Sequence, residues 1–404
     1  MRLPVLFIMI TVMIDAMGIG LIMPVMPDLL TEVGGGTLGK AAIWGGILST
    51  SFAAMQFLFG PVLGGLSDRY GRRSVLLLSL VIMAADYLVM AVAGTMWLLL
   101  IGRLVGGITA ATHSTANAYI ADISKPEDKA ANFGLIGAAF GIGFVLGPLI
   151  GGLLAEYGTR APFYAAAALA ALNAVFGWVV LTETVTDAIR RPFSLARSNP
   201  FGALKVLGKL PSIGKLLVVF FLYQVAFTVY PAIWAYFGKA RFDWDPAMIG
   251  LSLGLFGITI ALVQGLLIRP FIARFGERGT VIWGLGFDLI AFSFLAFVTS
   301  GTVALIFTPI AALAGIVTPA LQGIMSKAVG DDQQGELQGA LTSVSALAMI
   351  LSPMAMTYTF AVFTAQSAPV YMPGAPFLLS VGLVAVALAL FVRAGRPPAA
   401  QHVT

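Results

Sequence analysis

The feature that most constrains this chain is a series of long apolar runs, which short polar or charged segments separate. A helix needs about 20 mainly apolar residues to cross a lipid bilayer. Hydrophobic residues make up 59% of the 404 residues and charged residues 10%, against roughly 25% charged residues in a soluble domain. The charged residues are too few to cover the water-facing surface of a soluble protein of this size. We therefore expect the runs to span a membrane. The twelve runs cover residues 4–27, 41–66, 74–93, 96–121, 131–155, 162–182, 213–238, 246–271, 280–299, 301–326, 336–364 and 376–393.

The predicted fold is an all-α integral membrane protein with twelve transmembrane helices. The composition argues against a soluble enzyme, a nucleic-acid-binding protein, a secreted disulfide scaffold and a disordered chain. The net charge of +5 is no sign of nucleic-acid binding, because Lys and Arg collect in the cytoplasmic loops of membrane proteins. The chain has no cysteine, which excludes disulfides and thiolate metal ligands. We expect the first run to be a retained span and not a signal peptide, because it contains Asp15 and lacks a small-residue cleavage site.

The distribution of Lys and Arg predicts the orientation of the chain. With the N-terminus placed inside, 17 of these residues lie in inner loops and tails, four lie in outer loops, and two lie within spans. The outer four are Lys40, Arg160, Lys239 and Arg241. An excess of this kind marks the cytoplasmic side, so both termini are predicted to be cytoplasmic.

The chain is predicted to form two six-helix bundles, residues 1–182 and 213–404, joined by a cytoplasmic linker at 183–212. An internal repeat supports this division, although chance matches among glycine-rich helices are the alternative. Parallel repeats of six helices occur in secondary transporters. Residues 201–210 of the linker fit either a short helix at the membrane surface or a flexible segment. At an offset of 205 residues the matched pairs are Gly45 and Gly250, Arg69 and Arg274, Gly71 and Gly276, Arg73 and Arg278, Gly134 and Gly339, and Pro148 and Pro353.

Four ionisable residues fall deep within the predicted spans: Asp15, Asp86, Asp288 and Arg103. A charge at the centre of a membrane helix costs about 2.5–3.5 kcal/mol on the insertion scale. Arg103 can neutralise one carboxylate in a purely structural role, but three acids and one base leave at least two carboxylates without an arginine. A buried carboxylate without a counter-charge takes up a proton more readily. We therefore expect these residues to couple a proton to transport.

Neutral polar side chains at span depth form a second set of candidates. Each can be explained by a hydrogen bond between helices, and together they can line a polar cavity that faces a ligand. His113 is the only histidine within a span; it can relay protons near neutral pH, and a neutral packing role is the alternative. The cavity candidates are Gln56, Asn117, Gln224, Gln264 and Gln322.

The segment between the second and third spans reads GGLSDRYGRR from Gly64 to Arg73. Arginines on the inner side follow from topology alone, but the aspartate at the helix end and the glycine turn do not. Asp68 can pair with a neighbouring arginine or with a helix N-terminus, and such contacts can hold two bundles in one conformation. The second copy has Ala273 at the Asp68 position and Glu277 at the Arg72 position, so the predicted gate is asymmetric. The candidates here are Asp68, Arg69, Arg72 and Arg73.

The fifth span combines Gly147 and Pro148 with further glycines at short intervals. Proline removes a backbone hydrogen bond and kinks a helix. Glycines at this spacing allow close approach of a neighbouring helix, so we expect Gly147 and Pro148 to shape a moving interface.

These motifs resemble those of the major facilitator superfamily. The stretch from Gly64 to Arg73 resembles the signature between its second and third helices, and the stretch from Gly143 to Gly152 resembles its antiporter signature in helix 5. Ile101-Gly-Arg103-Leu with Gly106 and Gly107 resembles the helix-4 signature, whose arginine is implicated in proton transfer. The resemblance implies a fold of two six-helix bundles and transport by alternating access.

Within that superfamily, the chain looks like the tetracycline/proton antiporters of Gram-negative bacteria. The likeness rests on Asp15 to Pro27, Asp86-Tyr87, Ile120-Ala-Asp122, Asp288, Pro319 to Gln322 and Gln334 to Gly339. It implies export of a divalent-metal–tetracycline complex in exchange for a proton, with the three membrane aspartates important and Asp122 added to the gate. The chain departs from the family in helix 8, where residues 258–264 lack the histidine of the drug-resistance members.

The function expected from the sequence is proton-coupled drug efflux across the bacterial cytoplasmic membrane, with tetracycline as the expected drug. The expected partners are a small-molecule drug, protons and the lipid bilayer, for a chain that works as a monomer and is not an enzyme. We expect no protein-bound metal and no cofactor, because Mg²⁺ would travel with the substrate. A symporter or metabolite carrier on the same fold is the first alternative. A membrane-embedded enzyme or receptor is the second, and it lacks the catalytic cluster or soluble domain that it would need.

Overall fold

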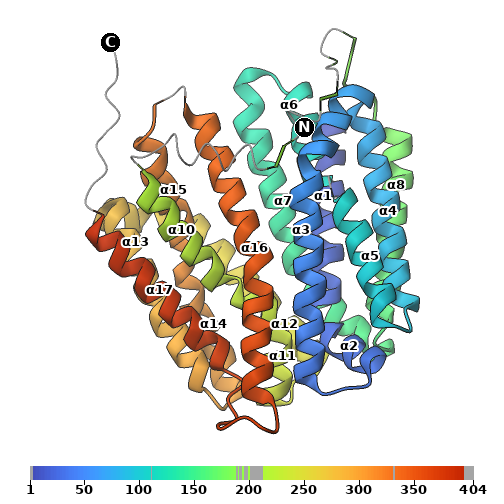
Figure 1. The fold of residues 1–404 in the computed structure, drawn as a ribbon. Coiled ribbons are helices and arrows are strands. Elements are labelled where there is room, and N and C mark those ends of the chain that lie inside the picture. Colours follow the sequence, from blue (N-terminus) through green and yellow to red (C-terminus); the bar gives the residue numbers. More distant parts are fainter. Residues whose placement is uncertain are drawn as a thin grey trace. The chain divides into compact units, whose positions relative to one another are not determined.

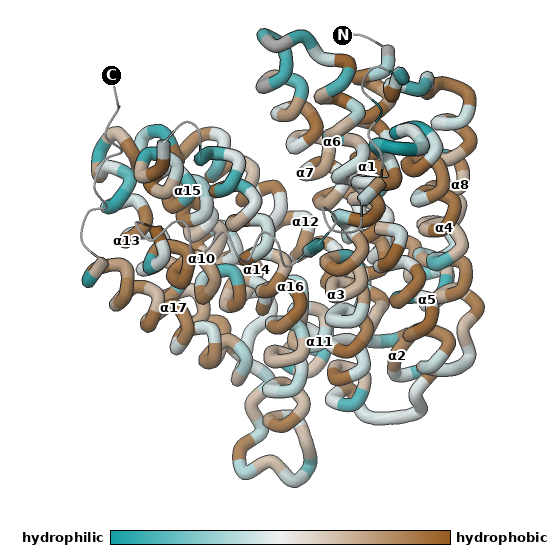
Figure 2. Tube along the Cα trace, turned by 45° about the horizontal axis from the view of Figure 1, so that its top comes forward, coloured by the Kyte–Doolittle hydropathy of each residue, from teal (hydrophilic) through white to brown (hydrophobic). Residues whose placement is uncertain are grey.

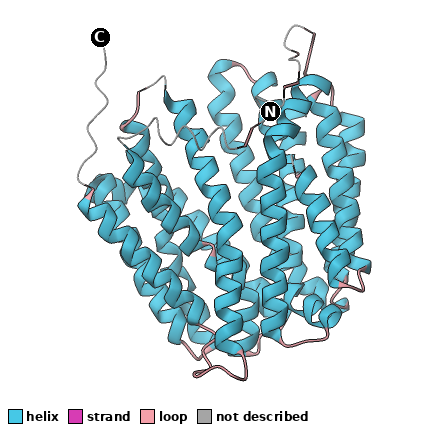
Figure 3. Ribbon diagram, in the orientation of Figure 1, coloured by secondary structure: helices cyan, strands magenta, loops and turns pink. Residues whose placement is uncertain are grey.

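The structure is a computed structural model that describes residues 3–110, 112–187, 190, 193–194, 199–200, 213–330 and 333–394, without the side chains of Leu3, His113, Pro126 and Ala130. These residues form helices and connecting segments, without a strand (Figure 3). Hydrophobic residues dominate the helices, and hydrophilic ones gather toward helix ends and loops (Figure 2). The linker segment 201–210, for which a surface helix was one prediction, lies outside the described residues.

The described part contains 11 helical stretches that are long and apolar enough to cross a membrane by length and composition. One of them, Pro246–Phe297, has 52 residues and covers two of the twelve predicted runs. Gly276 interrupts it with a non-helical φ of 69° and ψ of 170°. The prediction of an all-α membrane fold with about twelve spans is confirmed.

The helices follow one another along the chain as Figure 1 shows. Those before the linker region are α1 (Leu3–Ile22), α2 (Met26–Gly34), α3 (Leu38–Tyr70), α4 (Arg72–Val92), α5 (Met96–Thr109), α6 (Thr112–Ile123), α7 (Lys129–Leu154) and α8 (Ala161–Val180). Those after it are α10 (Gly214–Phe227), α11 (Val229–Phe242), α12 (Pro246–Leu262), α13 (Ile268–Phe297), α14 (Gly301–Ala312), α15 (Val317–Lys327), α16 (Gln334–Thr364) and α17 (Ala375–Arg393). Short turns of 3-10 helix are η1 (Met23–Val25), η2 (Pro126–Asp128), η3 (Ala155–Tyr157) and η7 (Leu313–Ile316), and η6 (Val263–Leu267) is a π-helical turn.

The contacts divide the chain into two compact units. The first contains residues 1–37, 47–200 and 245–254, and the second contains 38–46, 201–244 and 255–404. Each unit thus includes the beginning of a helix, α12 or α3, whose remainder belongs to the other unit. The division into 1–182 and 213–404 stays a prediction.

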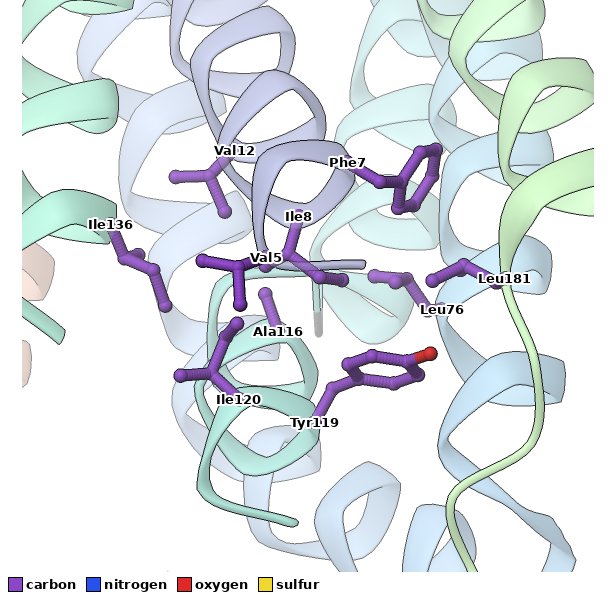
Figure 4. Close-up of a cluster of buried hydrophobic side chains, with 10 residues drawn as sticks. All are labelled: Val5, Phe7, Ile8, Val12, Leu76, Ala116, Tyr119, Ile120, Ile136 and Leu181. Carbon is purple, nitrogen blue, oxygen red and sulfur yellow. The ribbon is translucent and has the colours of Figure 1, made fainter. Parts of the chain in front are cut away.

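The first unit is built around α1, which packs against α7 and α8 (Figure 1). A cluster of buried apolar side chains surrounds the beginning of α1 (Figure 4). The close-up shows side chains from α1, α4, α6, α7 and the residue after α8: Val5, Phe7, Ile8, Val12, Leu76, Ala116, Tyr119, Ile120, Ile136 and Leu181. The cluster thereby fixes α4, α6, α7 and the segment after α8 to one end of α1.

Glycines explain why α7 lies so close to α1. A Cβ atom on Gly147 would lie 2.6 Å from the Met17 carbonyl oxygen and 2.8 Å from Gly20 Cα. Gly143 and Gly151, one turn away on either side, face Met13 and Leu21 in the same way. Only residues without a Cβ permit this backbone contact. The structure therefore places Gly147 against α1 within the first unit.

The breaks within the helices follow the predicted repeat. The turn η1 begins at Met23, and Thr228 separates α10 from α11, 205 residues later. Ala110 ends α5, and Gly315 lies in η7 between α14 and α15, again at an offset of 205. Gly71 and Gly276 both have positive φ, 106° and 69°. Conformations of this kind favour glycine, so the backbone itself repeats and not only the sequence.

Candidate functional site

The first buried carboxylate, Asp86 of α4, forms an ion pair with Arg103 of α5. The Asp86 residue is 5% exposed, and the Arg103 guanidinium lies over the Phe52 ring at 5.0 Å from its centre. Asp86 Oδ1 and Arg103 Nε have no hydrogen-bond partner. The pair therefore neutralises the two charges but leaves polar atoms on both sides unsatisfied.

Glycines in α5 make the room that this carboxylate needs. A Cβ on Gly102 would lie 2.9 Å from Asp86 Oδ1, and one on Gly106 would lie 2.7 Å from Oδ2. Any larger residue at either position would displace the carboxylate. The motif from Ile101 to Gly107 in α5 thus supplies both the cation and the space for its partner.

Asp15 of α1 is half-buried and forms no ion pair in the part of the chain that the structure describes. Its Oδ1 atom is buried without a hydrogen-bond partner. The Thr112 and Tyr87 side chains lie close enough to interact electrostatically with its carboxylate. Tyr87 also packs on α1, since a Cβ on Gly18 would lie 3.0 Å from the Tyr87 hydroxyl.

Asp288 of α13 is the most enclosed of the three, at 0% exposure. Both of its carboxylate oxygens are buried without a hydrogen-bond partner. Tyr223 of α10 and Tyr230 of α11 interact electrostatically with it. The Tyr230 hydroxyl is buried and unpaired as well, and its ring lies 5.5 Å from that of Phe292, one turn after Asp288. An acid in this environment is compatible with burial when it holds a proton.

Three of the five predicted cavity amides form hydrogen bonds between helices. Gln56 Nε2 donates to the Ala110 carbonyl at 3.4 Å, and Gln264 Nε2 donates to the Gly315 carbonyl at 3.2 Å. These carbonyls are the repeat-related positions where the α5–α6 and α14–α15 connections break the helix. Gln224 Nε2 donates to Ser345 Oγ at 3.4 Å. These three amides therefore satisfy polar groups within their own units.

The remaining polar candidates are placed less specifically. Asn117 and Gln322 are half-buried in α6 and α15. His113 lies in α6, and its side chain is outside the described part. The choice between a proton relay and a packing role for His113 therefore stays open.

The predicted inner gate is assembled around Arg72. Its guanidinium forms an ion pair with Asp68, donates to Ser67 Oγ at 2.6 Å and lies 3.3 Å from Asp122 Oδ2. The Glu183 carboxylate accepts from the Arg72 backbone N–H at 2.9 Å. The turn after α3 is thus tied both to the end of α6 and to the segment after α8.

The other two predicted gate arginines point elsewhere. Arg73 donates to the Trp178 carbonyl near the end of α8 at 2.7 Å. The Arg69 guanidinium lies over the neighbouring Tyr70 ring at 5.1 Å. Pro148 lies in α7, and its carbonyl oxygen is in contact with Gly250 of α12. Of the predicted set, Asp68, Arg72 and Asp122 therefore form one cluster.

Sequence reasoning missed two kinds of residue at the site: the aromatic side chains near the buried aspartates, and Glu183 itself. Phe52, Tyr223 and Tyr230 lie in apolar runs that contain several other aromatic residues, so no local signal in the sequence distinguishes them. Glu183 follows the last helix of its half and could have been noted as an acid opposite a cluster of inner arginines. Within the described residues no group of three or more His, Cys, Asp and Glu side chains could hold a metal ion.

Known proteins match this chain along most of its length. The model of the Major Facilitator Superfamily matches residues 8–353 and 216–403. The class C tetracycline resistance protein of Escherichia coli is 44% identical over 351 residues, 87% of this chain and 88% of that protein. The class G protein of Vibrio anguillarum is 41% identical over 359 residues, 88% of this chain and 90% of that protein.

Solved structures agree on the architecture. The crystal structure of the nucleoside transporter NupG matches with a TM-score of 0.77 over 97% of this chain and 99% of that one. At 15% identity this likeness shows the fold alone. Together with the two repeat-related halves and the buried acids, the matches identify the chain as a member of the Major Facilitator Superfamily, in the family of the tetracycline resistance proteins.

Proposed function

We propose that the protein is a tetracycline/proton antiporter of the bacterial cytoplasmic membrane. The observation that carries the proposal is the set of three aspartates at span depth, of which, within the described residues, only Asp86 has a buried cation beside it. Relatives named as tetracycline resistance proteins, up to 44% identical, support the drug class. The substrate is tetracycline as its complex with a divalent cation such as Mg²⁺, which travels with the drug and is no cofactor of the protein. The chain works as a monomer with both termini in the cytoplasm and catalyses no chemical reaction.

The mechanism follows from the differences among the acids. A carboxylate without a counter-charge in an apolar environment binds a proton, and it releases the proton when water or a cation reaches it. Asp288 forms no ion pair with any residue in the described part of the chain and is the proposed proton carrier. Asp15 is half-buried and has one unsatisfied oxygen, so it is the proposed contact for the cationic drug complex. Arg103 keeps Asp86 ionised and fixes α4 against α5, and alternating access exposes the acids to one side of the membrane at a time.

Uptake of tetracycline into inverted membrane vesicles tests the proposal. Vesicles that contain the protein should accumulate tetracycline when Mg²⁺ and an inwardly acid proton gradient are present. An uncoupler should abolish the accumulation, and vesicles without the protein should show none. Absence of uptake by folded protein would contradict tetracycline as the substrate.

A second substrate class is favoured by one observation at the end of α12. Residues 258–264 contain no histidine, and Gln264, which lies in the π-helical turn η6, bonds to the Gly315 carbonyl. The alternative is a proton-coupled exporter or symporter of another drug or small metabolite. A panel of cationic and neutral drugs in the same vesicles distinguishes the two, because only the alternative predicts uptake of a panel compound without uptake of tetracycline.

A further inference from the structure

The turns after α3 and after Gly276 are anchored in the same way. Arg73, two residues after Gly71, donates to the Trp178 carbonyl near the end of α8 at 2.7 Å. Arg278, two residues after Gly276, donates to the Phe391 and Val392 carbonyls near the end of α17, each at 2.9 Å. Both arginines therefore fix a glycine turn to the last helix of their own half.

A second contact of these turns is kept with its charges exchanged. At the offset of 205 residues, Arg72 corresponds to Glu277 and Asp122 corresponds to Lys327. Arg72 Nε lies 3.3 Å from Asp122 Oδ2, and Lys327 Nζ lies 2.8 Å from Glu277 Oε1. Each pair ties a glycine turn to the end of α6 or α15. If only one residue of the pair had changed its charge between the two copies, like charges would face each other. Both copies therefore keep an attraction between opposite charges, although the acid and the base have changed places.

The Glu277 carboxylate is also seated on α15. A Cβ on Gly323, one turn before Lys327, would lie 3.1 Å from Glu277 Oε1. The acid thus contacts the helix surface as well as the lysine. The sequence alone suggested an asymmetric gate, because the Asp68 position holds Ala273. The structure shows that both copies nevertheless have the ion pair that ties the glycine turn to a helix end, which is that of α6 in the first copy and that of α15 in the second.

We propose that Glu277 and Lys327 are positioning residues of the transport cycle, and that they hold the turn at Gly276 within α13 against α15 as Arg72 and Asp122 hold the turn after α3 against α6. The requirement is for opposite charges and not for an acid at 277. This inference rests on the proposed function only for its transport assay.

A purely stabilising role predicts a small effect. The Lys327 side chain is 73% exposed and that of Glu277 is 22% exposed. Ion pairs of this exposure contribute about 0–1 kcal/mol to stability. The decisive measurement is therefore transport by folded protein, and not the unfolding temperature.

The test is an exchange of charges in the full chain. Lys327→Glu and Glu277→Lys should each lower the initial rate of proton-driven tetracycline uptake by about fivefold, the effect of about 1 kcal/mol on a rate. The double variant should return to within about twofold of the parent, because the attraction is restored. Lys215→Glu, which reverses an exposed charge at the beginning of α10, is the matched control and should leave the rate unchanged. Unchanged single variants, or a double variant no faster than the singles, would overturn the proposal.

A readout without drug separates failure of this proposal from failure of the proposed function. The chain has no cysteine, so Ala328→Cys supplies one thiol next to Lys327. Ala328 is 8% exposed, and maleimide labelling of the thiol should be several times faster in either charge-reversed variant and return to the parent rate in the double variant. If the parent takes up no tetracycline, the proposed function fails while the labelling still decides about the pair. Equal labelling rates in all four proteins would contradict it.

Discussion

Asp86 and Asp288 are both buried acids at span depth, yet their surroundings are opposite. Asp86 lies between the glycines of α5 and pairs with Arg103. Asp288 is 0% exposed, has two unpaired oxygens and lies among tyrosines. A buried ion pair keeps both partners charged, whereas an isolated buried carboxylate is expensive unless it is neutral. The comparison assigns a fixed charge to Asp86 and an exchangeable proton to Asp288.

The largest expected effect is the loss of proton-driven transport when Asp288 can no longer exchange a proton. Asp288→Asn keeps the shape of a neutral carboxyl group, so the protein should remain in the membrane at the parent level. Proton-driven tetracycline uptake should fall by at least about a hundredfold, or about 2.7 kcal/mol in rate. Initial rates in inverted vesicles, normalised to protein, measure this. Transport by the variant at the parent rate would remove Asp288 from the coupling mechanism.

The same substitution at Asp86 should mainly destabilise the protein. Asp86→Asn leaves the Arg103 charge buried without a partner, which costs about 3–5 kcal/mol in a buried pair. The temperature at which the detergent-solubilised protein aggregates should therefore fall clearly, whereas Asp288→Asn should leave it unchanged or raise it. The double variant Asp86→Asn with Arg103→Gln removes both charges and should recover most of the loss. Equal stability of the two single variants would contradict the assignment.

A smaller effect is expected from filling the space beside the Asp86 carboxylate. Gly106→Ala places a Cβ 2.7 Å from Asp86 Oδ2, so the ion pair must shift. Overpacking of this kind costs about 1–3 kcal/mol. Gly60→Ala in α3 is the control, since nothing lies within 4 Å of its Cβ and alanine favours a helix by about 0.5–1 kcal/mol. The aggregation temperature should fall for the first variant and not for the second.

The sequence predicted the fold well because its signals are physical and local. Long apolar runs define the spans, and the matches at an offset of 205 predicted a repeat that the breaks at Met23 and Thr228 and the turns at Gly71 and Gly276 confirm. The interruptions between α5 and α6 and between α14 and α15 were missed. They lie at Ala110 and Gly315, and neither an alanine nor a single glycine predicts a break in a membrane helix that packs against other helices.

The candidate site was predictable in composition but not in pairing. Three acids and one base could be counted, but which acid meets Arg103 depends on how α5 packs against α4. The amides Gln56 and Gln264 looked like cavity residues, and their bonds to carbonyls at the helix breaks become visible only when the breaks are known. The charge exchange between Arg72–Asp122 and Glu277–Lys327 was present in the repeat. The sequence does not show that residues 122 and 327 each contact a glycine turn, so the two pairs could be compared only after the structure showed both contacts.

The smallest expected effect concerns the tyrosine hydroxyl beside Asp288. Tyr230 Oη has no partner while Asp288 is enclosed, so Tyr230→Phe removes a buried unsatisfied group and should not lower stability. When Asp288 gives up its proton, a nearby hydroxyl can donate to the carboxylate, and losing a hydrogen bond of about 0.5–1.5 kcal/mol slows that step by about twofold to about twelvefold.

Tyr236→Phe is the matched control for this prediction. Tyr236 is buried in the same helix at 5% exposure, and its ring packs against Phe360. Uptake should fall for Tyr230→Phe and stay at the parent rate for Tyr236→Phe, with equal aggregation temperatures. A parent rate for both variants would mean that Asp288 releases its proton without help from α11, and that water rather than tyrosine stabilises the ionised carboxylate. The surroundings of Asp288 and Asp86 would then differ in their effect on the proton only through Arg103.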